Sequence, residues 1–247
     1  MTFVIYRLYA MLRKHFAYLM PIQSIRFGRA RMADEAVRYI NSIDLEGDYF
    51  EFGVYRGSTF SCFYHLFKKY ASERTLWAYD SFKGLPPLTK DDSWTTDTVE
   101  GSSSWSEGQY SYGIDEFLRF MKWWNVPESY IKIVPGFFKD SLKNHDPSVK
   151  AAIIWIDCDL YSSTVSVLNF SKTLLQEGTM VLFDDFGGRD VRGERRALKD
   201  FLDLNPDIEF VPYMKFHTKG AAFLVFKKGQ QASISEGNPH YDLLPTK

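Results

Sequence analysis

The chain has 247 residues, of which 45% are hydrophobic and 17% aromatic, and its formal net charge is −1. This length suits one large domain, or one domain with extensions, that buries a sizeable core. The near-neutral charge gives no reason to expect a nucleic-acid partner. The two cysteines, Cys62 and Cys158, have no C-x-x-C spacing, so we expect neither a structural zinc site nor a disulfide framework, and we predict a cytoplasmic location.

The first 20 residues form a predicted amphipathic helix. Apolar side chains recur there at helical spacing, at Val4, Leu8, Leu12, Phe16 and Leu19. Arg7 interrupts the apolar run that a signal peptide would need, and the segment is too short and too charged to span a bilayer. We expect this helix to pack on the domain or on a second subunit, which would make the protein a homo-oligomer. Attachment to a membrane surface is the alternative, and we do not favour it.

From about residue 48, apolar runs alternate with helical patterns. Strands are expected at 48–54, 74–80, 130–136, 151–157, 178–185, 208–213 and 221–228. Helices are expected at 57–71, 113–124, 164–176 and 192–205. This alternation indicates an α/β fold with a mostly parallel sheet of seven strands and helices on both faces. The last two strands are separated by a short turn, so they should form an antiparallel pair at one edge.

The same pattern predicts the domain organisation. Residues 1–46 form an N-terminal helical extension, residues 47–228 form the domain, and residues 229–247 form a polar tail. Residues 84–112 are a long connection without regular structure, and such connections are usually functional or disordered. Because Trp94, Trp105 and Tyr110 interrupt its polar sequence, we interpret this loop as a lid over a substrate site.

A glycine-containing turn, EFGVYRGS at residues 51–58, joins the first strand to its helix. Gly53 and Gly57 would allow a tight turn and a close approach to a ligand. Asp80 ends the next strand, where a ribose-binding carboxylate belongs in an adenosine site. Glu51 and Tyr55 stand where a pyrophosphate cradle would need bare amides. A cofactor with a cationic centre and an amino-acid tail fits better, and S-adenosylmethionine has both.

Four acids follow two successive strands: Asp157, Asp159, Asp184 and Asp185. If these strands are neighbours, the acids meet at one edge of the sheet, where they must take up protons or bind a cation. A set of oxygen ligands favours Mg²⁺ first, then Mn²⁺ or Ca²⁺. The structural alternative is that the acids cap helices and pair with Arg189 and Arg192.

Two other enzyme classes use a D-x-D motif after an apolar strand. A haloacid-dehalogenase-type phosphatase would use the first Asp as its nucleophile. That motif normally opens the domain and has Thr or Val where Tyr161 stands here. A metal-dependent glycosyltransferase would bind a sugar nucleotide, which leaves the glycine turn, Asp80 and the second acidic pair unexplained.

Five stretches together resemble the macrocin O-methyltransferase (TylF-type) family of sugar methyltransferases, which depend on S-adenosylmethionine and Mg²⁺. These stretches are YFEFGVYRGSTF (49–60), WAYDSFKGLP (77–86), IKIVPGFFKDSL (131–142), WIDCDLYSSTVSVL (155–168) and MVLFDDFGG (180–188). They occur in the family's order and cover about residues 47–227. The resemblance implies a Rossmann-like class I methyltransferase fold and a sugar, glycan or nucleotide-linked acceptor.

The resemblance also implies roles for individual residues. Cofactor-binding residues would be Glu51, Gly53, Tyr55, Gly57, Ser58, Asp80, Ser81, Gly136, Phe137 and Asp157. Asp157, Asp184 and Asp185 would hold Mg²⁺, and Asp159 would be the general base. Related enzymes place a His or Lys base three residues after the first metal ligand, where this chain has Leu160.

A run of arginines at positions 189, 192, 195 and 196 lies beside the acids in the sequence. A solvated helix face, with i,i+3 or i,i+4 pairs to Glu194 and Asp200, is the favoured interpretation. Recognition of an anionic acceptor is the alternative. His217 lies between the last two strands, where it could reach an acceptor, although we expect an ordinary turn residue.

Overall fold

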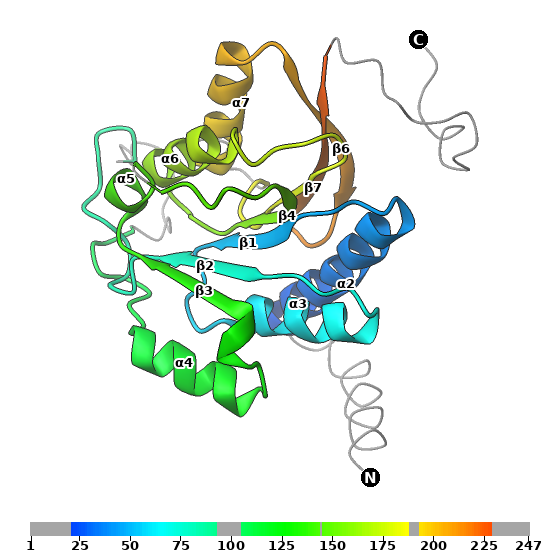
Figure 1. The fold of residues 1–247 in the computed structure, drawn as a ribbon. Helices are drawn as coiled ribbons and strands as arrows, with labels where there is room; N and C mark the ends of the chain where they lie inside the picture. The colour runs from blue at the N-terminus through cyan, green and yellow to red at the C-terminus, as the bar shows by residue number, and fades with distance from the viewer. Residues whose placement is uncertain (1–20, 93–104, 144, 188–192, 229–247) are drawn as a thin grey trace.

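The computed structural model describes residues 21–92, 105–143, 145–187 and 193–228, and of residues 21–26 only the backbone. These residues contain one sheet of seven strands in the order β3-β2-β1-β4-β5-β7-β6 (Figure 1). The strands are β1 (Asp48–Phe52), β2 (Leu76–Asp80), β3 (Ile131–Pro135), β4 (Ala151–Ile156), β5 (Met180–Phe183), β6 (Ile208–Lys215) and β7 (Ala221–Lys227). Strands β1 to β5 pair in parallel, while β7 runs antiparallel to both β5 and β6. The predicted α/β architecture is confirmed.

Helices cover both faces of the sheet (Figure 1). One face carries α2 (Pro21–Ser42), α3 (Ser58–Lys69) and α4 (Ile114–Trp123). The other face carries α5 (Phe138–Ser141), α6 (Tyr161–Ser171) and α7 (Glu194–Leu204). A short 3-10 helix, η1 (Glu128–Tyr130), precedes β3. Each face has its own hydrophobic core, so the ends of the central strands are held between two packed layers.

Strand β4 shows why the sequence folds in this way. Every residue of its sequence AAIIWI is buried. Ile153 and Trp155 join the core beneath α2 and α3, whereas Ile154 and Ile156 join the core beneath α6 and α7. Burying each large side chain stabilises the fold by about 1.5–3 kcal/mol. Strands apolar on both faces are typical of the centre of a parallel sheet, and β4 leads directly to Asp157.

Most element boundaries differ from the sequence prediction by a few residues, and two of these differences bear on the site. Helix α6 begins at Tyr161 instead of 164, because Asp92 from the long loop accepts hydrogen bonds from the Ser162 amide (2.9 Å) and hydroxyl (2.7 Å). This distant carboxylate satisfies a first-turn amide that would otherwise lack a partner. Strand β5 ends at Phe183, before the two acids, so Asp184 and Asp185 lie in the turn that follows it.

Several predicted segments lie partly or wholly outside the described residues. They are the amphipathic segment 1–20, the centre of the long loop at 93–104 with Trp94, and the tail 229–247. Helix α2, which belongs to the predicted extension, packs into the same core as β1 and β4 through Met32, Ala36 and Ile40. The domain boundaries stay a prediction. No helix among the described residues combines the length and hydropathy needed to cross a membrane.

Candidate active site

The carboxyl ends of β4 and β5 bring three acids together. Ile156 of β4 pairs with Phe183 of β5, so the residues that follow these two positions are neighbours. One carboxylate oxygen from each of Asp157, Asp184 and Asp185 lies within 4.8 Å of the other two. Asp184 is buried, and the other two acids are half-buried. This spacing allows one small cation to contact all three side chains.

Asp159 occupies the turn between β4 and α6 in an unusual backbone conformation. Its φ is 58°, in the left-handed region that few residues other than glycine adopt. Burial and the neighbouring carboxylate of Asp185 raise the pKa of Asp159 well above its usual range. Burial and the charge of Asp184 do the same to the pKa of Asp157. A strained backbone beside a cluster of acids is typical of functional sites.

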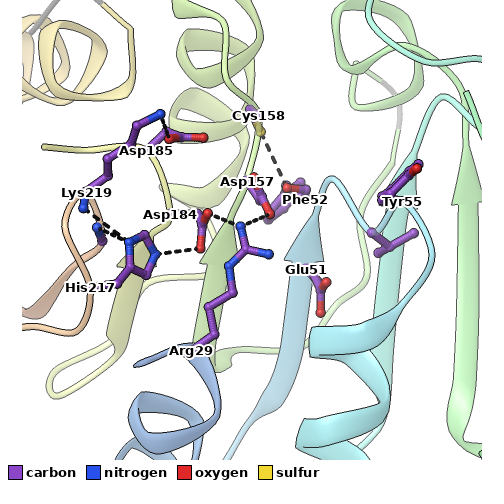
Figure 2. Close-up of polar contacts among 12 residues, drawn as sticks. Arg29, Glu51, Phe52, Tyr55, Asp157, Cys158, Asp184, Asp185, His217 and Lys219 are labelled. Atoms are coloured by element: carbon purple, nitrogen blue, oxygen red, sulfur yellow. Dashed lines mark hydrogen bonds and ion pairs between the residues drawn. The ribbon is translucent and has the colours of Figure 1, made fainter. Parts of the chain in front are cut away.

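Arg29 reaches the acids from helix α2, which lies far from them in the sequence (Figure 2). Its Nη2 atom donates a hydrogen bond to Oδ2 of Asp184 and lies 3.5 Å from Oδ2 of Asp157. The preceding residue, Gly28, makes this possible, because a Cβ there would overlap the carbonyl oxygen of Phe216. The helix can therefore approach the β6–β7 turn closely enough to place the guanidinium among the carboxylates.

The turn between β6 and β7 supplies two further side chains. His217 Nε2 lies 3.2 Å from Oδ1 of Asp184, and its Nδ1 accepts hydrogen bonds from the amides of Lys219 (3.2 Å) and Gly220 (3.1 Å). Because Nδ1 accepts, the ring is neutral and Nε2 carries the proton that is donated to Asp184. Lys219 Nζ lies 2.8 Å from Oδ1 of Asp185.

Glu194, the first residue of α7, is fully buried beneath the acids. Its two oxygens accept hydrogen bonds from the amides of Cys158 (3.1 Å) and Asp185 (3.0 Å). Burial and the charge of Asp185 raise the pKa of Glu194 well above its usual range. One side chain therefore fixes the backbone of both acidic turns, after β4 and after β5.

Among the residues that the structure describes, the acids outnumber the cationic groups that contact them. Asp157, Asp184 and Asp185 meet Arg29 and Lys219, while His217 is neutral, and Asp159 adds a further carboxyl beside Asp185. Such a cluster must take up protons or a further cation. Oxygen ligands at this spacing fit a hard divalent ion such as Mg²⁺. The donor set therefore agrees with a metal centre.

The turn after β1 lies next to the acids. Gly53 has a φ of 89°, and a Cβ at this position would overlap the carbonyl oxygen of Asp157. Glycine is thus required by the close approach of two strand ends. Glu51, two residues earlier, is buried and accepts a hydrogen bond from the hydroxyl of Tyr49. Burial raises the pKa of Glu51 to about 8.

Asp80, at the end of β2, is bound to the backbone around it. Its Oδ2 accepts hydrogen bonds from the amides of Val54 (2.9 Å) and Tyr55 (3.1 Å), and its Oδ1 accepts one from Phe82 (2.7 Å). The carboxylate therefore holds the turns after β1 and β2 together. Ser81 donates its hydroxyl to the carbonyl of Gly84 at 2.6 Å and so shapes the start of the long loop.

A cavity of about 1040 Å³ opens over the ends of the parallel strands. Of the residues predicted to bind the cofactor, seven line it: Gly53, Tyr55, Asp80, Ser81, Gly136, Phe137 and Asp157. The other three, Glu51, Gly57 and Ser58, are not part of its wall. Gly57 instead faces the side chains of Phe117 and Met121 on α4. All four acids of the cluster, Arg29, His217 and Lys219 line the same cavity.

The described ends of the long loop also line this cavity. Tyr110 packs edge-on against Tyr55, with ring centroids 5.7 Å apart, and Trp105 lies 6.0 Å from Tyr110. The two ends of the loop are joined by hydrogen bonds between Leu85 and the backbone of Gly108 and Gln109. Asp92 and its hydrogen bonds to Ser162 then fix the loop to α6. These contacts hold aromatic rings beside the acids.

Only part of the arginine run at positions 189, 192, 195 and 196 lies among the residues that the structure describes. Arg196 forms an ion pair with Asp91 (3.1 Å), lies 3.7 Å from Asp200 and stacks over the ring of Tyr161. The expected pair with Asp200 is confirmed, whereas the expected solvated position of Glu194 is wrong, because Glu194 is buried and accepts hydrogen bonds from two backbone amides. Arg189 and Arg192, the arginines that the sequence suggested as partners of the acids, lie outside the described residues.

Four residues that contact this site were not predicted to do so from the sequence: Arg29, Asp92, Glu194 and Lys219. Arg29 and Glu194 lie in helices, where their positions match those of ordinary exposed charges. His217 could be located by its position between the last two strands, but its bond to Asp184 could not. Only the tertiary fold brings these side chains to the strand ends.

The fold and site together define a class I O-methyltransferase architecture. A solved structure of the O-methyltransferase NovP superimposes with a TM-score of 0.64 at 20% identity, and the match covers 80% of this chain and 79% of that one. A model of the macrocin-O-methyltransferase (TylF) family matches residues 13–213. The chain therefore belongs to the macrocin-O-methyltransferase family, as the sequence resemblance predicted. Membership of a methyltransferase family disfavours the phosphatase and glycosyltransferase alternatives.

Two curated relatives are similar over parts of their length. Mycinamicin III 3''-O-methyltransferase of Micromonospora griseorubida is 28% identical over 147 residues, which are 57% of this chain and 55% of that protein. The 8-demethyl-8-(2,3-dimethoxy-alpha-L-rhamnosyl)-tetracenomycin-C 4'-O-methyltransferase of Streptomyces olivaceus is 28% identical over 182 residues, 71% of this chain and 68% of that protein. The match to the first relative thus spans little more than half of its length.

Proposed function

We propose that the protein is an S-adenosylmethionine- and divalent-cation-dependent O-methyltransferase that methylates a sugar hydroxyl. One observation carries this proposal: the oxygens of Asp157, Asp184 and Asp185 converge within 4.8 Å at the wall of a cavity that reaches Asp80 and Gly136. Three acids that could hold a cation thus share one cavity with a space that could take a nucleoside. The family membership supports methyl transfer as the reaction.

The cofactor end of the cavity lies over β1, β2 and β3. S-adenosylmethionine carries a methyl group on a positively charged sulfur and is already activated, so the protein mainly has to align the attacking oxygen. Gly53 and Gly136 leave room for backbone contact, and Phe137 offers a face for adenine. Asp80 still has acceptor capacity for ribose hydroxyls beyond its three amide donors. Glu51, which is outside the cavity wall, would act through the turn that it supports.

The acid end of the cavity is proposed to hold the cation through Asp157, Asp184 and Asp185. When bound, a divalent cation would lower the pKa of an acceptor hydroxyl beside it. His217 orients Asp184 through a hydrogen bond of 3.2 Å, and Glu194 fixes the turns that carry Asp157 and Asp185. Mg²⁺ is the ion favoured by an all-oxygen set, with Mn²⁺ or Ca²⁺ as substitutes.

Asp159 is the proposed general base. It lines the cavity beside Asp185, and its raised pKa makes its carboxylate a stronger proton acceptor than an ordinary one. Its side chain would accept the hydroxyl proton as the methyl group is transferred. Lys219, which contacts Asp185 in the same part of the cavity, is the nearest alternative group.

The acceptor class is inferred from the relatives and from the loop. The two relatives named above methylate sugar-bearing molecules according to their names. The loop residues Leu85, Trp105 and Tyr110 give the cavity an apolar and aromatic wall, which fits a glycosylated small molecule. In this proposal the loop 84–112 acts as a lid that excludes water. The homo-oligomer formed through the N-terminal helix and the cytoplasmic location stay predictions.

Calorimetric titration with S-adenosylmethionine, with and without Mg²⁺, tests this proposal. We expect a one-site binding isotherm for the cofactor, and a separate isotherm for Mg²⁺ that disappears in Asp157→Ala. A protein that binds no S-adenosylmethionine would refute the methyltransferase assignment. Hydrolysis of generic phosphoesters would instead revive the phosphatase alternative.

A further inference from the structure

Arg29 occupies a place that the proposed metal centre also needs. Its Nη2 atom bridges Oδ2 of Asp184 and Oδ2 of Asp157, two of the three acids that converge at the site (Figure 2). A cation held by Asp157 and Asp184 would need the same two carboxylates that the guanidinium now contacts. The guanidinium carries a full positive charge at any ordinary pH, because the charges of Asp157 and Asp184 outweigh the effect of burial and raise its pKa. Arg29 and a divalent ion would repel each other at contact distance.

The two partners of Asp184 differ in their freedom to move. The side chain of His217 is 4% exposed, and its ring is fixed by two backbone amides. The side chain of Arg29 is 28% exposed and extends from α2 along several rotatable bonds. His217 is also neutral, so it can remain beside Asp184 when a cation is present. Arg29 is therefore the partner that has to withdraw.

We propose that Arg29 is an internal counter-ion that competes with the divalent cation for Asp157 and Asp184, so that metal binding requires the guanidinium to leave its place between these carboxylates. This inference rests on the metal site of the proposed function and adds a regulating residue to it. Arg29 compensates the charges of buried Asp184 and half-buried Asp157 before the cation arrives, and it lowers the apparent affinity of the site. Exchange of the guanidinium for the cation also links the metal site to helix α2, because Arg29 lies 155 residues before Asp184 in the sequence.

The competition predicts that one substitution at Arg29 lowers stability when no ion is bound and raises the affinity for the ion. Arg29→Met keeps most of the length of the side chain and removes its charge. Without a divalent ion, the variant leaves Asp157 and Asp184 uncompensated, so its melting temperature should fall below that of the wild type. With the ion bound, the variant has lost a competitor, so its metal affinity should rise. A purely structural ion pair would predict the first effect without the second.

The experiment is a titration with Mn²⁺, followed by calorimetry and by the paramagnetic resonance of free Mn²⁺, on metal-stripped protein. We expect Arg29→Met to bind Mn²⁺ about tenfold or more tightly than the wild type. Arg29→Lys, which keeps a charge in a more compact group, should lie nearer to the wild type. Arg31→Met is the matched control, because Arg31 is exposed on the same helix, and it should bind Mn²⁺ as the wild type does.

Melting temperatures in chelator and in excess Mn²⁺ supply a second measurement that does not depend on activity. The stabilisation by Mn²⁺ should be larger for Arg29→Met than for the wild type. If Arg29→Met does not fold without metal, it can be purified with Mn²⁺, and its affinity is then measured by competition with a chelator of known Mn²⁺ affinity.

Unchanged or weaker Mn²⁺ binding by Arg29→Met would overturn the competition while leaving the metal site intact. If neither the wild type nor the variant binds Mn²⁺, both the competition and the proposed metal centre are wrong. The cofactor half of the proposed function is tested separately, by the titration with S-adenosylmethionine.

Discussion

His217 donates a hydrogen bond from Nε2 to Oδ1 of Asp184 across 3.2 Å, and two backbone amides hold its Nδ1 as an acceptor. The neutral ring orients a buried carboxylate without bringing a charge to it. Substitution of a residue that orients a metal ligand in this way usually lowers metal affinity or activity by about 10–100-fold. Arg29 contacts the same carboxylate, but its guanidinium brings a positive charge to it.

From this relationship we expect His217→Ala to weaken Mn²⁺ binding by about 10–100-fold. The reason is that Asp184 loses the bond that fixes its orientation. Calorimetry on metal-stripped protein measures the effect. His65→Ala, which removes an exposed histidine from α3, should leave the affinity unchanged. Wild-type affinity in His217→Ala would mean that the hydrogen bond plays no part in orienting the ligand.

Glu194→Gln tests how the two acidic turns are held. The carboxylate accepts one hydrogen bond from Cys158 and one from Asp185, whereas a carboxamide has a single acceptor oxygen and presents an NH₂ group to the other amide. Leaving one buried amide without a partner costs about 1–3 kcal/mol. Urea denaturation should show this loss, together with weaker Mn²⁺ binding. The matched control is Glu209→Gln on β6, where the side chain is exposed; equal stability of the two variants would contradict the assignment.

Asp159→Asn tests the general base. The substitution keeps the size of the side chain and removes its ability to accept the hydroxyl proton, so kcat should fall by about 10²–10⁴-fold. Binding of S-adenosylmethionine and of Mn²⁺ should be retained, since neither depends on that proton transfer. Asp203→Asn, at an exposed position on α7, serves as the control. If Asp159→Asn keeps its kcat, the base is another group, and Lys219→Met becomes the next variant to measure.

Glu51 gives the fold a pH dependence with a definite sign. Its pKa is raised from 4.5 to about 8 by burial, so between these values the folded protein holds a proton that the unfolded chain has lost. The contribution of Glu51 to the free energy of unfolding is therefore fully present below pH 4.5. It decreases as the pH rises towards 8, by at most about 1.4 kcal/mol per pH unit. In Glu51→Gln this part of the decrease should be absent.

Urea denaturation of the cofactor-free and metal-free protein between pH 5 and pH 8 measures the slope that Glu51 contributes. Glu128→Gln, at an exposed position in η1, is the control and should keep the wild-type slope. Identical slopes for wild type and Glu51→Gln would show that Glu51 is ionised throughout this range.

The sequence predicts those parts of the site that depend on strand ends. The run AAIIWI is apolar at every position, so β4 and the place of Asp157 could be located directly. The paired acids after β5 could be located by the same pattern, and adjacency of the two parallel strands then brought them together. The glycine turn and Asp80 followed from the order of the first two strands.

The parts that the sequence does not reveal arise from contacts between distant elements. Arg29 has the same helical pattern around it as the exposed Arg31, and only the packing of Gly28 against Phe216 turns it towards the acids. Glu194 begins a helix, as exposed glutamates often do, yet it is buried. The start of α6 was misplaced because its capping carboxylate, Asp92, lies 70 residues earlier.

The central claim is that a divalent cation held by Asp157, Asp184 and Asp185 supports methyl transfer from S-adenosylmethionine to a sugar hydroxyl. The most direct measurement follows transfer of a labelled methyl group to a panel of glycosylated and nucleotide-linked sugars, before chelation, after exhaustive chelation and after Mg²⁺ is restored. We predict that transfer to at least one acceptor is lost on chelation, returns with Mg²⁺, and is absent from Asp157→Ala under all three conditions. Methyl transfer that continues at full rate in the chelated wild-type protein would contradict this role of the cation.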